Sequence, residues 1–284
     1  MTWLQAMVLA VLQGASELFP VSSLGHTVLV PALLHWNVDR SDPTFLAFVV
    51  ALHLGTAIAL IVFYVRDWAR IVRALLTSIA RGKLSSDPDE RLGWLLIVGT
   101  IPVAIVGLFL EKPVRQFFGS VPLVATFLIL NAFVMFAGEA LRRRALHQAD
   151  ASQPLATLSW RDGGIIGFSQ AAALLPGISR SGSSIVAALV MRLTHEDAAR
   201  FSFLLATPVI FAASVLEIPQ LFAPGSARIL AQAGVGGVLA AVTAYASVAF
   251  LTRWFHAHDL RPFGWYCLIF GAACLALALA KVIA

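Results

Sequence analysis

The stretch FPVSSLGH (residues 19–26) interrupts a long apolar segment with a proline, a glycine, two serines and a histidine. The apolar residues around it, over residues 2–35, would otherwise suit a helix inside a membrane. A second interruption, LPGISRSGSS (residues 175–184), breaks the apolar region 163–191 in the same way. Irregular backbone is tolerated at membrane depth only where protein or water covers it. We therefore expect both breaks to line a polar cavity.

The composition is that of a helical membrane protein. Of the 284 residues, 59% are hydrophobic and 12% are charged, about half the charged fraction of an ordinary soluble domain. Six further apolar runs have about the length that crosses a bilayer. These predicted spans are 44–65, 92–110, 121–140, 201–220, 229–252 and 264–283. We predict an all-α integral membrane protein with one membrane domain (1–284), six spanning helices and two re-entrant helix-loop-helix elements at the breaks.

The net charge of +5 does not indicate a nucleic-acid partner, because the basic residues lie in short loops between apolar runs. Such loops follow the positive-inside rule. If each broken region enters and leaves the membrane on one side, fourteen basic residues share a side: Arg66, Arg70, Arg73, Arg81, Lys83, Arg91, Arg142, Arg143, Arg144, Arg161, Arg192, Arg200, Arg253 and Arg261. The opposite side has five: Arg40, Lys112, Arg115, Arg228 and Lys281. The first side is then cytoplasmic, both termini lie outside, and the two breaks enter from opposite faces.

The two broken regions resemble each other. QGASELFPVSSLGH begins at Gln13, and QAAALLPGISRSGSS begins at Gln170. A Phe-led apolar run follows each, FVVALHLGTAIAL at 48–60 and FSFLLATPVIFAA at 201–213. Broken helices at matching positions of two halves point to the binding site in repeat-built membrane proteins. We predict an inverted repeat, with residues 1–140 and 160–284 as its halves, whose breaks meet near the membrane midplane.

The residue types at the breaks suit an anion. A second half-helix is expected after each break, with Ser22 or Ser23 as the first N-cap and Ser181 or Gly182 as the second. A helix N-terminus exposes unpaired N–H groups and a partial positive charge, which suit phosphate. Arg180 lies in the second break, where a buried guanidinium needs an anionic partner. Its fork geometry matches phosphate oxygens.

The first break supplies candidates for phosphoryl transfer. His26 follows Ser23 by three residues and Ser22 by four, so on a helix they share a face. A serine and a histidine within reach of each other can act as nucleophile and base. Glu17 could orient the imidazole, hold a divalent cation or carry a proton. Together with Arg180, these side chains describe phosphoryl transfer better than any other reaction. The alternative is that Glu17 and Arg180 merely pair with each other.

Other polar residues are expected to be structural. His53 and Asn131 are interpreted as hydrogen-bonding groups between helices, with the cavity as an alternative for His53. We expect Glu139 and Glu217 near water at the ends of spans, and His195 as part of a solvated helix cap. The stretch GTIPVAIVG (99–107) is interpreted as a packing surface of small residues.

At these motifs the chain resembles the undecaprenyl-diphosphate phosphatase family, also called the bacitracin-resistance protein family. QGASELFPVSSLGH and LPGISRSGSS resemble its two signature segments, and GTIPVAIVGLFLE (99–111) resembles a third. The resemblance implies an inner-membrane enzyme of bacteria that removes the terminal phosphate of a C55 polyprenyl diphosphate and so recycles the lipid carrier of peptidoglycan synthesis. It implies two re-entrant elements, a site open to the periplasm and a dependence on Mg or Ca ions. The expected partners are the lipid substrate and a second copy of the chain in a homodimer.

The resemblance also assigns residues. The family's catalytic glutamate, serine, histidine and arginine fall on Glu17, Ser23, His26 and Arg180, with Ser23 favoured over His26 as nucleophile. The expected substrate-binding residues are Gln13, Ser22, Gly177, Ser179 and Ser181, and Glu17 is the candidate metal ligand. Two departures matter. The first motif has Glu or Gln where this chain has Gln13, which removes one anionic ligand for a metal. The second motif usually ends in Thr, where this chain has Ser184.

Two other functions fit parts of this pattern. Inverted repeats with broken helices are typical of transporters, so a transporter or flippase of a phosphorylated polyprenyl lipid is the main alternative. An intramembrane serine protease could use Ser23 and His26. Acyl transfer has no need of a guanidinium clamp, so Arg180 argues against the protease.

Overall fold

The regular structure of the chain is helical. The computed structural model describes residues 1–36, 38, 43–115, 120–148, 152–217, 222 and 227–283, and no β-strand forms among them. The helices in chain order are α1 (Trp3–Ser16), α2 (Ser23–Leu33), α3 (Pro43–Phe63), α4 (Val65–Arg81), α5 (Pro88–Arg115), α6 (Val121–Gln148), α7 (Trp160–Ser169), α8 (Arg180–Val190), α9 (His195–Glu217), α10 (Ala227–Trp254) and α11 (Arg261–Leu279). Two 3₁₀ helices, η2 (Leu155–Thr157) and η3 (Gln170–Leu174), flank α7.

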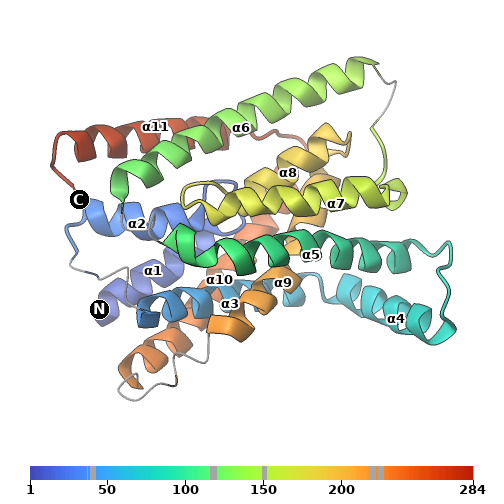
Figure 1. The fold of residues 1–284 in the computed structure, drawn as a ribbon, viewed down its shortest axis with the longest axis horizontal. Helices are drawn as coiled ribbons and strands as arrows, with labels where there is room; N and C mark the ends of the chain where they lie inside the picture. The colour runs from blue at the N-terminus through green and yellow to red at the C-terminus, as the bar shows by residue number, and fades with distance from the viewer. Residues whose placement is uncertain are drawn as a thin grey trace.

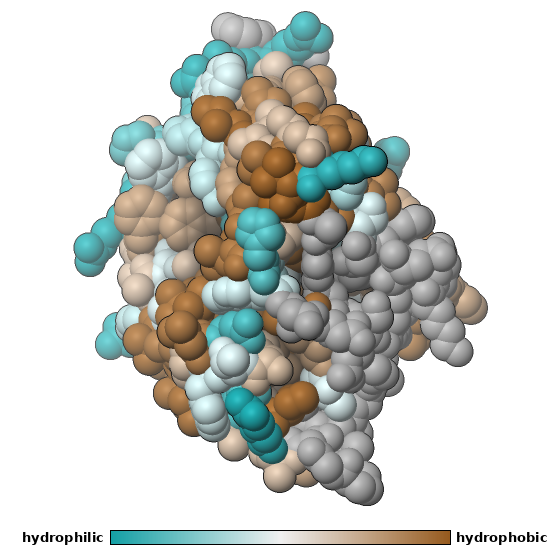
Figure 2. Space-filling view, turned by 90° about the vertical axis from the view of Figure 1, so that its left-hand side faces the viewer, coloured by the Kyte–Doolittle hydropathy of each residue, from teal (hydrophilic) through white to brown (hydrophobic). Residues whose placement is uncertain are grey.

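Six of these helices are long and apolar enough to cross a bilayer. They are Thr44–Phe63, Pro88–Leu110, Val121–Ala145, His195–Ser214, Ala227–Trp254 and Arg261–Leu279. Figure 2 views the molecule from the end where both termini lie, and there apolar residues alternate with polar and charged ones. The all-α class and the six spans predicted from the sequence are therefore confirmed. Residues 218–220, at the end of the predicted span 201–220, lie outside the described residues. So does Arg40, one of the five basic residues predicted on the outer side.

The long helices pack through close backbone contacts. α3 packs against α10, α6 against α11, and α5 against α7. A Cβ atom at Gly55 of α3 would lie 2.2 Å from the carbonyl oxygen of Gly237 on α10. A Cβ atom at Gly167 of α7 would lie 2.2 Å from the carbonyl oxygen of Gly99 on α5. Small residues let membrane helices approach this closely. Gly99 thus begins the packing surface that the sequence predicts at 99–107.

The two broken regions face each other in the middle of the molecule. α1 and α2 extend to the end where both termini lie, and α7 and α8 extend toward the opposite end (Figure 1). Both termini share one end, as the charge count requires. Each half of the chain begins with two short helices around a break and continues into a long apolar helix. The entry of these pairs into a membrane, and the repeat limits 1–140 and 160–284, stay predictions.

A serine caps each half-helix after its break. Ser22 adopts a φ of 67° and its Oγ accepts from the Gly25 N–H, so α2 begins at Ser23. Ser179 caps α8 in the same way, since its Oγ accepts from the Gly182 N–H. The prediction of Ser22 was correct. The prediction of Ser181 or Gly182 was wrong by two or three residues, because the extended backbone at Ser179 already satisfies the capping geometry.

Asn131 of α6 joins the two breaks. Its Nδ2 donates to the Pro20 carbonyl at 2.9 Å, and its Oδ1 accepts from the Ser179 N–H at 3.0 Å. The Ser181 hydroxyl donates directly across the gap to the Phe19 carbonyl at 3.1 Å. Irregular backbone carries polar groups that need partners. The side chain of Asn131 supplies them for both breaks at once, which confirms it as a hydrogen-bonding group between helices.

Two regions differ from the sequence expectations. The basic residues from Arg66 to Arg91 were assigned to a loop between spans, but most of this segment belongs to the helix α4. α4 packs on α5, and Trp94 Nε1 donates to Ser78 Oγ at 3.1 Å. Glu139 and His195 are not solvated. Glu139 is buried, and its carboxylate bonds His195 Nε2 at 2.7 Å. The side chain of Glu217 lies outside the described residues.

Replacement of Asn131 by alanine tests the connection between the breaks. We expect Asn131→Ala to lower the free energy of unfolding by about 2–4 kcal/mol, because the Pro20 carbonyl and the Ser179 N–H lose their buried partner. The measurement is thermal unfolding of the purified protein in detergent. Thr126→Val is the control, since that exposed hydroxyl of α6 bonds only its own helix. Equal melting temperatures for the two variants would contradict the role of Asn131.

Candidate active site

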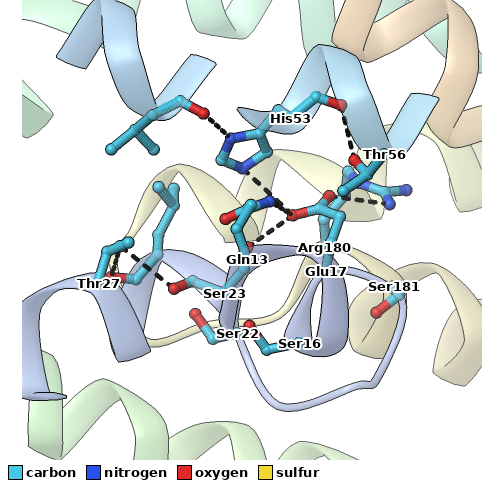
Figure 3. A network of polar contacts seen from close by, with 12 residues as sticks. Gln13, Ser16, Glu17, Ser22, Ser23, Thr27, His53, Thr56, Arg180 and Ser181 are labelled. Carbon is cyan, nitrogen blue, oxygen red and sulfur yellow. Dashed lines mark hydrogen bonds and ion pairs between the residues drawn. The ribbon is translucent and has the colours of Figure 1, made fainter. Parts of the chain in front are cut away.

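The carboxylate of Glu17 is the centre of the polar cluster between the breaks (Figure 3). Glu17 follows the last residue of α1, and its N–H bonds the Gln13 carbonyl at 2.9 Å, so the chain is still helical there. Its Oε2 accepts from Gln13 Nε2 at 2.9 Å and from the Ser23 hydroxyl at 2.6 Å. A serine hydroxyl that donates to a carboxylate is placed as a nucleophile beside its base.

Two basic side chains from other helices reach the same carboxylate. Arg180 Nη2, at the start of α8, lies 3.3 Å from Glu17 Oε1. His53 Nε2, on α3, lies 3.2 Å from Glu17 Oε2. The Glu17 side chain is 5% exposed, so its charge needs such partners. The pairing of Glu17 with Arg180, weighed above as an alternative, is formed. His53 faces the cluster rather than only a neighbouring helix.

His26 points away from Ser23. Its Nδ1 lies 2.7 Å from the Ser22 carbonyl oxygen, and its Nε2 lies 2.7 Å from the Tyr266 hydroxyl of α11. The ring also stacks on Phe270. A carbonyl oxygen can only accept, so Nδ1 carries a proton, and in the neutral ring Nε2 accepts from the Tyr266 hydroxyl. The bond between His26 and Ser23 that the spacing suggested is not formed, because the first turn of α2 directs the imidazole toward α11.

The predicted substrate-binding residues have structural partners of their own. The hydroxyls of Ser22 and Ser179 cap α2 and α8, and that of Ser181 bonds the Phe19 carbonyl. Gly177 has a φ of 114°, and a Cβ there would lie 2.5 Å from the Val124 carbonyl oxygen. Only glycine fits this position. These residues shape the break, and their contact with substrate stays a prediction.

The cluster is electrostatically suited to an anion. α2 and α8 both begin beside Glu17, and the first N–H groups of a helix have no partner within it. Arg180 adds a guanidinium whose Nε, like the Oε1 of Gln13, is buried without a hydrogen-bond partner in the described part of the chain. Buried polar atoms normally have partners. The free Nε can therefore donate to a bound anion, and the helix N-termini favour a negative charge beside it.

The residues do not fit a tightly held Mg or Ca ion. Such ions take six or more oxygen ligands, usually including several carboxylates. Within the described ranges, no group of three or more His, Cys, Asp or Glu side chains could hold a metal ion. Glu17 is the one carboxylate of the cluster, and both its oxygens already accept from protein donors. Gln13 supplies an amide where a second carboxylate could stand.

Sequence reasoning found four of the five side chains that meet here, namely Gln13, Glu17, Ser23 and Arg180. It gave His53 only as an alternative. The signal for His53 was an ionisable residue in the apolar span that follows the first break, a type of residue that is functional by default inside membranes.

The chain is similar to known proteins over nearly its whole length. A family model, "Bacitracin resistance protein BacA", matches residues 6–273. The undecaprenyl-diphosphatase of Mycobacterium avium (strain 104) is 47% identical, over 97% of both chains. That of Acidiphilium cryptum (strain JF-5) is 48% identical over 98% of both. Undecaprenyl-diphosphatase 2 of Chromobacterium violaceum is 46% identical over 98% of this chain and all of the relative. The chain belongs to the BacA family of bacitracin resistance proteins.

Proposed function

We propose that the protein hydrolyses undecaprenyl diphosphate to undecaprenyl phosphate and orthophosphate. The relatives that cover the whole chain carry the name of this activity. The observation that carries the proposal is the 2.6 Å bond from the Ser23 hydroxyl to Glu17, with Arg180 on the other oxygen of the same carboxylate. A nucleophile, a base and a cation for phosphate are thus assembled at one point.

In the proposed first step, Ser23 Oγ attacks the terminal phosphorus while its proton moves to Glu17 Oε2. The bond between that phosphorus and the bridging oxygen breaks, and the polyprenyl monophosphate leaves. In the second step, water attacks the phosphorus of the phosphoserine and loses a proton, the bond between Ser23 Oγ and phosphorus breaks, and orthophosphate departs. Ser23 then takes its proton back from Glu17. Phosphoryl transfer depends mainly on position and on stabilisation of charge. Arg180 and the N–H groups at the starts of α2 and α8 provide both.

Arg180 has to change its hydrogen-bond partner when the substrate binds. The guanidinium is held by the Glu17 carboxylate and, at 3.4 Å, by the Ser202 carbonyl. A diphosphate carries more negative charge than one carboxylate, and it can be bound in bidentate fashion by the guanidinium fork. We propose that Arg180 turns to the terminal phosphate and thereby releases the Glu17 oxygen that it holds. We propose that His26 Nε2 releases the Tyr266 hydroxyl, to which it is bonded at 2.7 Å, and then takes the proton of the water in the second step.

We propose that a divalent ion, where the reaction uses one, comes with the diphosphate. Mg²⁺ is commonly bound through substrate phosphates together with few protein ligands. The lack of a cluster of metal-binding side chains among the described residues supports this view. The ion is then part of the substrate rather than a resident cofactor.

The chain is a multi-pass membrane protein, and we propose the bacterial inner membrane as its place. The fourteen basic residues of one side support a cytoplasmic position for that side. The family resemblance implies a site that opens to the periplasm, and we propose the same for this chain. A homodimer stays a prediction. The flippase alternative would share the same anion site, but the family membership does not favour it.

Loss of the Ser23 hydroxyl or of the Arg180 guanidinium should strongly reduce phosphate release. We expect Ser23→Ala and Arg180→Ala to reduce phosphate release from C55 and farnesyl diphosphates by about 10²–10⁴-fold, because they remove the nucleophile or the charge clamp. The assay uses detergent-purified protein. Ser214→Ala is the control for the serine, since this buried hydroxyl bonds only its own helix. Arg200→Ala is the control for the arginine, because Arg200 pairs with Asp67 outside the site. A wild-type protein that releases no phosphate would favour the flippase.

Metal binding offers a second test. We expect no saturable uptake of Mg²⁺ or Ca²⁺ by the substrate-free protein in titration calorimetry, because the site offers only one carboxylate and its oxygens are occupied. A chelator should still slow turnover if the ion accompanies the diphosphate. Stoichiometric uptake of either ion that disappears in Glu17→Gln would show a resident metal site and contradict this part of the proposal.

A further inference from the structure

We infer that His53 is a positioning residue for the reaction, which holds the Glu17 carboxylate toward Ser23 while Arg180 binds the diphosphate. The inference rests on the proposed function. It concerns a residue of α3, outside the two broken regions that carry the other groups of the site.

Both ring nitrogens of His53 are fixed by oxygen atoms. Nδ1 lies 2.8 Å from the Val49 carbonyl oxygen, one turn earlier on α3, and Nε2 lies 3.2 Å from Glu17 Oε2. A carbonyl oxygen can only accept, so Nδ1 carries a proton. The second contact is then an N–H donor to the carboxylate when the ring carries both protons. Figure 3 shows the imidazole of His53 directed at Glu17 from α3.

The contact sets which way the carboxylate points. Oε2 receives His53, Ser23 and the Gln13 amide, whereas Oε1 receives Arg180. Glu17 follows the last turn of α1, where its backbone alone would leave the side chain several rotamers. Donors from three directions leave one orientation, with Oε2 at hydrogen-bonding distance from the Ser23 proton. Partners of this kind, which orient a reacting group without touching the substrate, commonly change activity by 10–100-fold.

The need for His53 follows from the two tasks of Arg180. The guanidinium balances Glu17 before substrate arrives, and it has to turn to the phosphate for the reaction. A buried carboxylate left without a partner is costly. His53 is the basic side chain that stays with Glu17 when Arg180 turns. It therefore keeps the base ionised and aimed at Ser23 during the step in which the proton moves.

The chain provides a matched control. His195 and Glu139 form a second buried histidine–carboxylate contact, 2.7 Å long, between α9 and α6. Glu139 also accepts from the Leu260 N–H at 3.0 Å. This pair includes none of the residues that bond Glu17. A change at His195 therefore reports what the loss of such a pair does to stability alone.

The test compares His53→Leu, His53→Gln and His195→Gln in the full-length purified protein. For each, kcat and KM of phosphate release from C55 diphosphate are measured together with the melting temperature. We expect His53→Leu to lower kcat by about 10–100-fold with little change in KM, because Glu17 loses its orientation but Arg180 still binds substrate. His53→Gln keeps one N–H donor and should recover part of kcat. His195→Gln should lower the melting temperature and leave kcat unchanged.

The outcomes separate the inference from the function on which it rests. An active wild type whose His53→Leu variant keeps kcat would overturn the role of His53 alone. It would also be overturned if His53→Gln and His195→Gln lost kcat in the same proportion to their loss of melting temperature. Such a result would indicate that His53 has only a structural role. A wild type without phosphate release overturns both the function and the inference. Should His53→Leu fail to fold, the comparison of His53→Gln with His195→Gln decides the question.

Discussion

The ion pair between Glu17 and Arg180 is the contact on which the rest of the site depends. It joins residues 163 positions apart, one at the end of α1 and the other at the start of α8, and so connects the two broken regions at a buried point. Neither charge is tolerable alone at that depth. Arg180 therefore requires the half of the chain that carries Glu17 to be in place, and the hydrogen bonds of Asn131 to both breaks hold the backbone in the position that the pair needs.

The two halves use one local structure for two different groups. Ser22 and Ser179 are equivalent caps, since each accepts from an N–H three residues later. The first residue of each capped helix is then Ser23 in one half and Arg180 in the other. The same type of capping bond thus places a hydroxyl on one carboxylate oxygen of Glu17 and a guanidinium on the other. An anion between two helix N-termini meets a nucleophile from one and a positive charge from the other.

Much of this arrangement could be predicted from the sequence, because the signals were local. Apolar run length determines the spans, and the Pro, Gly and Ser residues of the breaks determine where the short helices stop. Tertiary contacts decided the rest. The direction of His26 depends on Tyr266, 240 residues away, and the role of His53 depends on how α3 packs beside α1. The amphipathic α4 was overlooked because its arginines were counted only as loop charges.

The central claim is that Glu17 and Arg180 pair directly across the breaks, and a double-mutant cycle on stability tests it without any assay of activity. Thermal and denaturant unfolding of the wild type, Glu17→Gln, Arg180→Gln and the double variant would give the coupling free energy. A direct buried pair predicts that each single change destabilises the protein, and that the double change costs less than their sum by about 1 kcal/mol or more. Additive losses would show that the two side chains do not interact, and would contradict the account.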